Sequence, residues 1–277
     1  MSAAVESFIE ADRSRFRALT WGGGDETVLF LHGLSGVADV WIPTVEHLAG
    51  RRRYVAIDQR GHGQTTVQGD DYSAEAMVAD TEAVIRFLGG SPHLVGHSMG
   101  ARIAMLVASR RAELLRSVTI VDIGPDKWQA NIDSTRAGVE RRPERFASRD
   151  ELFAFAFRNR EPTELDRRIM LARFAEHPDG SLTWHASREA LVRCVTGQRS
   201  RNYWSEWRNL SLPALFIHGG ASNEVPTRIA EKMRRENPAV GFERFEGIGH
   251  NIPLIAPEQL ARSLERFWRS AAGARSY

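Results

Sequence analysis

The segment LVGHSMG, residues 94–100, combines residue types and spacing that could carry out chemistry. Ser98 stands between Gly96 and Gly100, after a short apolar run and before a stretch with helical periodicity. A sharp strand-to-helix turn needs small residues two positions before and after its tip, and it lifts the hydroxyl clear of the sheet. The first N–H groups of the following helix then point at any oxyanion formed there. The pattern predicts a nucleophilic Ser98; the structural alternative is a glycine-pinched turn.

A serine nucleophile needs a general base, and the base needs an acid that orients it. Among nine histidines, His250 in EGIGHNIP is the candidate base, because it follows the last expected strand on a glycine-flanked loop. The alternative is a loop histidine that caps the next helix. We expect His97 to point elsewhere because it adjoins Ser98, and we expect His32 and His62 to shape their own turns.

The elements that must position these residues alternate between short apolar runs and amphipathic stretches. This alternation is typical of a parallel sheet that is covered on both faces. Expected strands lie at residues 28–31, 54–57, 93–95, 118–121, 213–219 and 240–245, after a hairpin pair within residues 8–19. Expected helices lie at residues 38–48, 73–88 with Ser73 as N-cap, 101–109, 227–235 and 257–270.

Residues 127–209 break this rhythm. They show helical segments rich in Arg, Glu, Phe and Trp and no convincing strand. We therefore predict an α/β fold, a mostly parallel doubly wound sheet with an inserted helical cap. The first part of the core is expected at residues 1–124, the cap at 125–209 and the second part of the core at 210–277.

Composition limits the classes of protein that fit. The 277 residues carry 37 basic and 35 acidic side chains and a net charge of +2, which is no nucleic-acid signature. The single Cys194 excludes an internal disulfide, and the N-terminal residues lack the basic start and apolar run of an export signal. No apolar stretch approaches the roughly 20 residues that span a bilayer. We expect a cytoplasmic protein with a small-molecule partner, not a nucleic acid or a membrane; the oligomeric state stays open.

Four motifs together resemble those of the α/β-hydrolase family. They are LHGLSG at 31–36, DQRGHGQT at 58–65, GHSMG at 96–100 and GIGH at 247–250, and they span the expected core from end to end. The resemblance implies an α/β-hydrolase fold with the cap inserted after the strand at 118–121. It also implies an oxyanion hole formed by the backbone N–H groups of Leu34 and Met99.

The position of the acid departs from the usual family pattern. Most members carry an aspartate in a G-x-x-D pattern after the strand that here ends at Gly219, but this chain has Ser222 there. A hydroxyl cannot stabilise an imidazolium by a full charge. Asp122, at the end of the neighbouring strand where some members place the acid, is the favoured candidate, and Glu224 is its rival. The structural alternative for Asp122 is an N-cap of the first inserted helix.

A narrower resemblance rests on GHSMGAR, VDIGP and GGASNEV. These segments are similar to those of amidohydrolases of the 2-(acetamidomethylene)succinate hydrolase and N-formylmaleamate deformylase type. That resemblance implies that cap arginines grip substrate carboxylates. Arg136 and Arg158 match those positions, although Asn159 stands where a tyrosine is expected. Trp128 and Trp204 are candidates for flat apolar walls of the pocket.

These residues predict a serine hydrolase without cofactor or metal. An acyl-enzyme on Ser98 would cleave a small amide or ester, with a carboxylate-bearing substrate as one option. A general carboxylesterase or thioesterase is the near alternative. Two further classes stay open: a cofactor-independent ring-cleaving dioxygenase that uses the His and Asp as a base, and a binding protein on a retired hydrolase scaffold. Labelling by a fluorophosphonate, oxygen uptake, or neither would separate the three classes.

Overall fold

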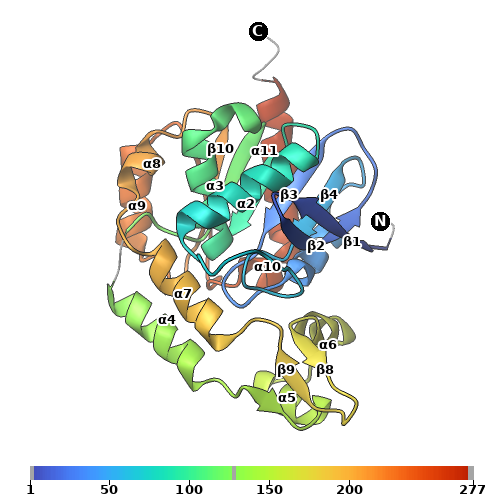
Figure 1. The fold of residues 1–277 in the computed structure, drawn as a ribbon. Helices are drawn as coiled ribbons and strands as arrows, with labels where there is room; N and C mark the ends of the chain where they lie inside the picture. The colour runs from blue at the N-terminus through green and yellow to red at the C-terminus, as the bar shows by residue number, and fades with distance from the viewer. Residues whose placement is uncertain (1–2, 127–128, 274–277) are drawn as a thin grey trace.

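Eight strands form the central sheet of the computed structural model, which describes residues 3–126 and 129–273 (Figure 1). The strand order is β1-β2-β4-β3-β5-β6-β10-β11. Strand β2 pairs antiparallel with β1 and β4, and the other neighbours are parallel, as the apolar pattern predicts. The strands are β1 (Val5–Ala11), β2 (Ser14–Trp21), β3 (Thr27–Leu31), β4 (Arg53–Ile57), β5 (His93–His97), β6 (Ser117–Val121), β10 (Ala214–Gly219) and β11 (Gly241–Phe245).

Alternate residues of the parallel strands bury themselves on opposite faces of the sheet. Leu29 and Leu31 of β3 join one apolar cluster, and Val28 and Phe30 join the other. The first cluster is covered by α2 (Ala74–Phe87), α3 (Met99–Arg110), α8 (Trp204–Arg208) and α9 (Thr227–Glu236). The second is covered by η1 (Ala38–Trp41), α1 (Ile42–Glu46), α10 (Ile252–Ile255) and α11 (Pro257–Gly273), and η2 (Ala112–Leu114) precedes β6.

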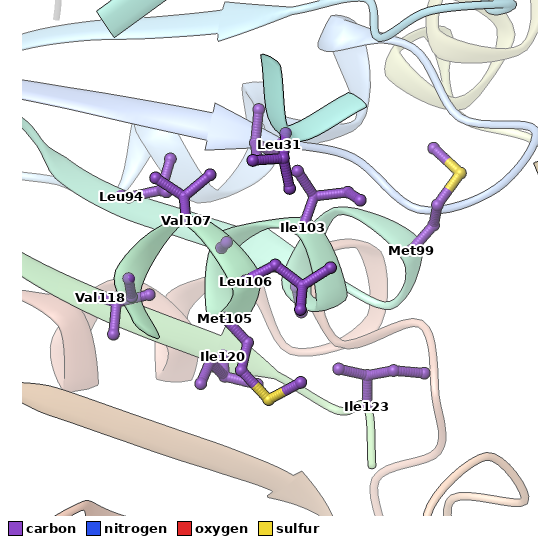
Figure 2. Close-up of a cluster of buried hydrophobic side chains, with 14 of the residues drawn as sticks. Leu31, Leu94, Met99, Ile103, Met105, Leu106, Val107, Val118, Ile120 and Ile123 are labelled. Carbon is purple, nitrogen blue, oxygen red and sulfur yellow. The ribbon is translucent and has the colours of Figure 1, made fainter. Parts of the chain in front are cut away.

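Helix α3 is the element that follows Ser98, and its apolar side chains fix its position. Figure 2 shows Ile103, Leu106 and Val107 of this helix packed over the side chains of β3, β5 and β6, where Leu31 and Leu94 are labelled. These residues are at most 1% exposed. The start of α3 is therefore held rigidly against the ends of the three central strands.

The expected helix at residues 38–48 is two short pieces. The 3-10 turn η1 ends at Trp41, and α1 begins with Pro43 near its start. Proline has no N–H to continue the preceding hydrogen-bond ladder but suits the first turn of a new helix. The N-cap predicted at Ser73 is confirmed, since its side chain accepts a hydrogen bond from the Ala76 N–H at 3.2 Å.

The segment between β6 and β10, called the insert below, corrects one expectation. Besides α4 (Gln129–Arg141), α5 (Arg149–Ala156), α6 (Glu164–Leu171), α7 (Arg188–Gln198) and α8, which covers the central sheet, it contains an antiparallel sheet. Its order is β7 (Arg145–Phe146), β9 (Leu182–Trp184) and β8 (Phe174–Glu176). The prediction of no strand was wrong because strands of two or three residues cannot establish an alternating pattern. Phe146, Phe174 and Leu182 bury a small cluster of their own with Leu152.

Figure 1 shows α4, α5, α6, β8 and β9 grouped below the central sheet and its covering helices in this view. Helix α4 packs along α7, which leads back toward the core. In the described ranges, no helix is both long and apolar enough to cross a membrane.

Candidate active site

Ser98 lies at the tip of a strained turn between β5 and α3. Its backbone has φ 52° and ψ −116°, a region that non-glycine residues rarely occupy. A Cβ at Gly96 would lie 2.3 Å from the carbonyl oxygen of Gly100, and a Cβ at Gly100 would lie 2.4 Å from that of Leu31. The glycine spacing seen in the sequence is therefore a steric requirement of this turn.

The structure brings Ser98, His250 and Asp122 into one hydrogen-bonded chain. The Nε2 atom of His250 lies 2.9 Å from the Oγ of Ser98, and its Nδ1 lies 2.7 Å from the Oδ2 of Asp122. The Asp122 side chain is fully buried, whereas that of His250 is 24% exposed. Such an arrangement can pass the Ser98 proton to Nε2 while the carboxylate holds the proton on Nδ1.

The carboxylate of Asp122 has two further hydrogen-bond donors. The Gly219 N–H donates to Oδ1 at 2.8 Å, and the Ser222 hydroxyl donates to Oδ2 at 2.5 Å. The alternative role of Asp122 as a helix N-cap is absent, because the first inserted helix begins only at Gln129. A buried carboxylate with this set of donors is satisfied in its ionised form.

Ser222 is a functional neighbour that sequence reasoning treated only as a missing acid. Its hydroxyl donates to Asp122 and accepts the Glu224 N–H at 3.1 Å, so the backbone of that loop orients the hydroxyl. The carboxylate of Glu224 instead accepts hydrogen bonds from Asn131 Nδ2 at 3.1 Å and Arg199 at 3.3 Å. The structure thus places Asp122, and not the rival Glu224, against His250.

Two backbone N–H groups beside Ser98 have the placement expected of an oxyanion hole. Met99 is the first residue of α3, and Leu34 lies in the turn after β3. Neither N–H donates to a protein acceptor within the described residues. The Gly100 N–H donates to the His32 carbonyl at 3.1 Å, which ties the start of α3 to the loop that carries Leu34. Unpaired donors of this kind can stabilise a developing negative charge.

His97, expected to point away from the chemistry, holds the loop of the candidate base. Its Nε2–H donates to the backbone carbonyl of His250 at 2.8 Å, and the two ring centroids are 4.8 Å apart. Burial, followed by the nearby His250, lowers the pKa of His97 to about 3. His97 is therefore neutral and acts on His250 through position and not through charge.

His32 and His62 were expected to shape their own turns, and they also tie the loop that carries Leu34 to the turn after β4. His32 Nε2 accepts the Gln59 N–H at 3.0 Å, and His62 Nε2 accepts the Ser35 N–H at 3.1 Å. Burial lowers the pKa of His62 to about 4 and the pKa of His32 well below its ordinary value. Both rings stay neutral and can keep accepting these backbone hydrogen bonds.

A cavity of about 620 Å³ lies between the core loops and the insert. Gly33, Leu34 and His97 form its inner wall, so the cavity begins at the residues that surround Ser98. The opposite wall comes from the end of α5, the loop after it and α6, and the segment after His250 closes the rim. The cavity therefore borders the loop whose Gly33 closely approaches the Ser98 side chain.

Three arginines line the cavity, and they differ in their ion-pair and hydrogen-bond partners. Arg160 is neutralised, because its guanidinium donates to both carboxylate oxygens of Asp166 at 2.6 and 2.7 Å. Arg158 lies over the Phe155 ring at 4.9 Å and has no ion pair with a described residue. Arg173 has a buried Nε without a hydrogen-bond partner, and burial lowers its pKa to about 10. Sequence reasoning missed Arg173; no motif marks it, and only its exposure to the cavity identifies it.

The other predicted substrate contacts lie elsewhere. Arg136 is on α4 with its side chain 53% exposed, paired with Glu140 one helical turn on at 2.8 Å. Trp204 is turned into the core, where its Nε1–H donates to Asp126 Oδ1 at 2.7 Å. Neither side chain lines the cavity beside Ser98, so both expectations are corrected. Trp128 lies outside the described residues.

Comparison with known proteins places most of the chain in one family. Residues 28–263 match the model of the alpha/beta hydrolase family. The 2-(acetamidomethylene)succinate hydrolase of Mesorhizobium japonicum is 28% identical over 247 residues, which cover 88% of each protein. The N-formylmaleamate deformylase of Pseudomonas putida is 28% identical over 258 residues, covering 88% of this chain and 89% of the relative.

A solved structure agrees with these sequence matches. The crystal structure of E-2-(acetamidomethylene)succinate hydrolase superposes with a TM-score of 0.88 and 25% identity, covering 96% of this chain and 99% of the other. Both the family resemblance and the narrower resemblance expected from the sequence are confirmed, as is the predicted fold class.

Proposed function

This chain belongs to the alpha/beta hydrolase family, and on that premise we propose that it is a cofactor-free serine hydrolase that cleaves a small amide or ester through an acyl-enzyme on Ser98. The observation that carries the proposal is the continuous hydrogen-bonded chain from Ser98 through His250 to Asp122. The relatives support hydrolysis of a C–N bond, since one is named for an acetamido compound and the other as a deformylase.

The contacts among Ser98, His250 and Asp122 support the following steps. His250 Nε2 takes the hydroxyl proton as Ser98 Oγ attacks the substrate carbonyl carbon, and the oxyanion accepts hydrogen bonds from the N–H groups of Leu34 and Met99. His250 then gives the proton to the leaving group, and the carbonyl–heteroatom bond breaks. Water, deprotonated by His250, attacks the acyl-enzyme and restores Ser98. Asp122 stabilises the imidazolium in both halves of the reaction.

Replacement of the nucleophile tests this mechanism. We expect Ser98→Ala to lower kcat by on the order of 10⁴-fold or more, because the three groups act as a unit and only binding and oxyanion effects remain. The measurements are hydrolysis of p-nitrophenyl acetate and labelling by a fluorophosphonate. Activity within about tenfold of wild type, which loss of the nucleophile does not allow, would sink the serine mechanism. Oxygen uptake in its place would favour the dioxygenase.

We further propose that the substrate carries a carboxylate and that the insert, residues 125–209, acts as a cap that binds it. Both relatives are named for anionic compounds, a succinate and a maleamate. In this chain Arg173 and Arg158 are the candidates, because both line the cavity and neither has an ion-pair partner among the described residues. Arginine offers the planar, forked donor set that a carboxylate accepts in pairs.

Lysine substitutions test the carboxylate contact, because lysine keeps the charge but loses the fork. We expect Arg173→Lys and Arg158→Lys to lower kcat/KM for an acetamidomethylene-succinate substrate by about 5- to 150-fold, equivalent to about 1–3 kcal/mol. Neutral p-nitrophenyl acetate should be almost unaffected. Arg136→Lys is the matched control outside the cavity and should change neither substrate. Equal losses for both substrates would assign these arginines a structural role.

A further inference from the structure

Arg102 is a buried cation without an anion. It lies one helical turn after Ser98 on α3 and is only 3% exposed. Its Nη1 has no hydrogen-bond partner, and no described residue forms an ion pair with its guanidinium. The contact that it does make is with the face of the Tyr203 ring, 5.3 Å away. Burial, with Arg199 nearby, lowers the pKa of Arg102 to about 10.

An unpaired buried guanidinium is costly to the folded chain, because its hydration is lost and nothing replaces it. Such groups in proteins are normally paired or bind a ligand. The Nη1 atom of Arg102 is a buried donor of this kind.

The side chain of Arg102 lines a cavity of about 390 Å³, here named the arginine cavity. Its walls come from α3, the residues after β6, the start of α4, the end of α7 and helix α9. Five cationic residues line it against the acidic Asp126 and Glu224. The cationic residues are Arg102, Arg199, Arg228, Lys232 and Arg235.

The two acidic groups do not neutralise the arginine cavity. Glu224 already pairs with Arg199 at 3.3 Å, and Asp126 accepts the Trp204 Nε1–H at 2.7 Å. Neither comes within ion-pair distance of Arg102. The cavity therefore keeps an excess of positive charge around a buried donor.

The arginine cavity is separate from the cavity in which we propose that the substrate binds. The two share no lining residue. Between them lies a space of about 10 Å³, lined by Leu34, Met99, Arg102 and Arg199 among others, which is too small for a substrate. Helix α3 connects the two sites, since it begins at the oxyanion donor Met99 and carries Arg102 one turn later.

We propose that the arginine cavity is an oxyanion-binding site that takes a carboxylate or phosphate group on the guanidinium of Arg102. Arg199 and Lys232 flank the bound group, and the exposed Arg228 and Arg235 stand at the mouth and attract it. Arginine matches the geometry of both carboxylate and phosphate, which accept two parallel N–H bonds. The inference goes beyond the proposed function, because binding here uses neither Ser98 nor the cavity beside it.

Thermal unfolding with and without anions tests the site. Inorganic phosphate and succinate are added separately up to about 10 mM at constant ionic strength, a range in which general salt effects on stability stay small. A ligand of the folded state raises Tm in a saturable way. A saturable rise with either anion is expected for wild type. A rise with phosphate alone identifies a phosphorylated ligand. A rise with succinate supports this site only where Arg102→Met or Arg228→Met weakens it, because the cavity lined by Arg173 is also proposed to bind a carboxylate.

Three variants locate the effect. Arg102→Met should weaken the apparent Kd by at least about tenfold, since it removes the forked donor. Arg228→Met, at the exposed mouth, should weaken it by a few-fold through lost attraction and tests the site even if Arg102→Met does not fold. Arg234→Met removes a charge from the same helix outside the cavity and should leave binding unchanged.

No saturable rise with either anion, or the same Kd for Arg228→Met, Arg234→Met and wild type, would overturn the proposal. The measurement needs no turnover, so it stands apart from the test of Ser98.

Discussion

Asp122 receives hydrogen bonds from three parts of the chain that meet only in the folded structure. The donors come from the end of β10, from the loop after it and from the loop that carries His250. Asp122 itself has φ 53°, so its backbone is held in a left-handed conformation that turns the side chain toward these donors. Ser222 thus supports the acid from the place where most of the family is expected to carry the acid itself.

Exchange of the acid for its amide tests the assignment of Asp122. We expect Asp122→Asn to lower kcat by about 10⁴-fold, because an amide presents N–H to His250 Nδ1 and favours the wrong tautomer. Glu224→Gln is the matched control, since its carboxylate pairs with Asn131 and Arg199, and it should change kcat by less than about tenfold. Steady-state kinetics with p-nitrophenyl acetate measure both. A reversed order would make Glu224 the acid.

Sequence reasoning reached the three residues of the hydrogen-bonded chain because each follows a strand at the same edge of the sheet. Parallel strands bring their carboxyl ends to one edge, so Ser98 after β5 and Asp122 after β6 lie side by side, and the loop after β11 carries His250 back to them. The arginines could not be chosen in the same way. Whether a side chain of the insert faces the cavity or the solvent depends on how the insert packs, and this separates Arg173 from Arg136.

At the scale of elements, the close backbone contacts at Gly96 and Gly100 fix the strand–turn–helix of β5 and α3. The sequence predicted these core elements because strands and helices there are long enough to show their periodicity. The hairpin of β8 and β9 was missed although it contains a signal, Asp179-Gly180, with Gly180 at φ 80°. An Asp-Gly pair favours a tight hairpin turn, but the flanking strands are too short to show alternation.

Glycine-to-alanine substitutions test the steric account of the turn at Ser98. Gly96→Ala should lower Tm and activity together, because its Cβ would lie 2.3 Å from the Gly100 carbonyl oxygen and the turn must open. Gly138→Ala in α4 is the control, since nothing lies within 4 Å of its Cβ. It should stabilise the protein by up to about 1 kcal/mol through helix propensity. Calorimetry and kinetics measure both variants; an unchanged Tm for Gly96→Ala would contradict the account.

At the scale of the whole molecule, three buried histidines link stability to pH. Burial lowers the pKa of His32, His62 and His97 below the ordinary value of 6.5. Below pH 6.5, therefore, these three rings bind protons in the unfolded chain but stay neutral in the folded chain. The stability that the neutral rings contribute is present above pH 6.5 and is lost as the pH falls. Burial raises the pKa of Asp58 to about 6, which opposes this trend in part.

His62→Gln isolates one of these contributions. Wild type should lose about 3 kcal/mol through His62 as the pH falls from 6.5 to 4, because the pKa of that ring is about 4 in the folded chain. The variant should be less stable than wild type at pH 7.5, and the gap should narrow as the pH falls. His47→Gln replaces an exposed histidine and is the control. Urea unfolding at each pH measures the gap; a constant gap would show that His62 does not titrate on unfolding.

The chain leaves the core after β6 and returns at β10, and these two strands are hydrogen-bonded neighbours, with Val118 beside Ala214. The sheet thus holds the two ends of the insert at a fixed separation, from the carboxyl end of β6 to the amino end of β10. The entropy of closing such a loop grows only by about 0.6 kcal/mol for each doubling of its length. The segment that faces the substrate can therefore be lengthened, shortened or exchanged with little change in the free energy of unfolding, while the reacting groups at the strand ends keep their positions.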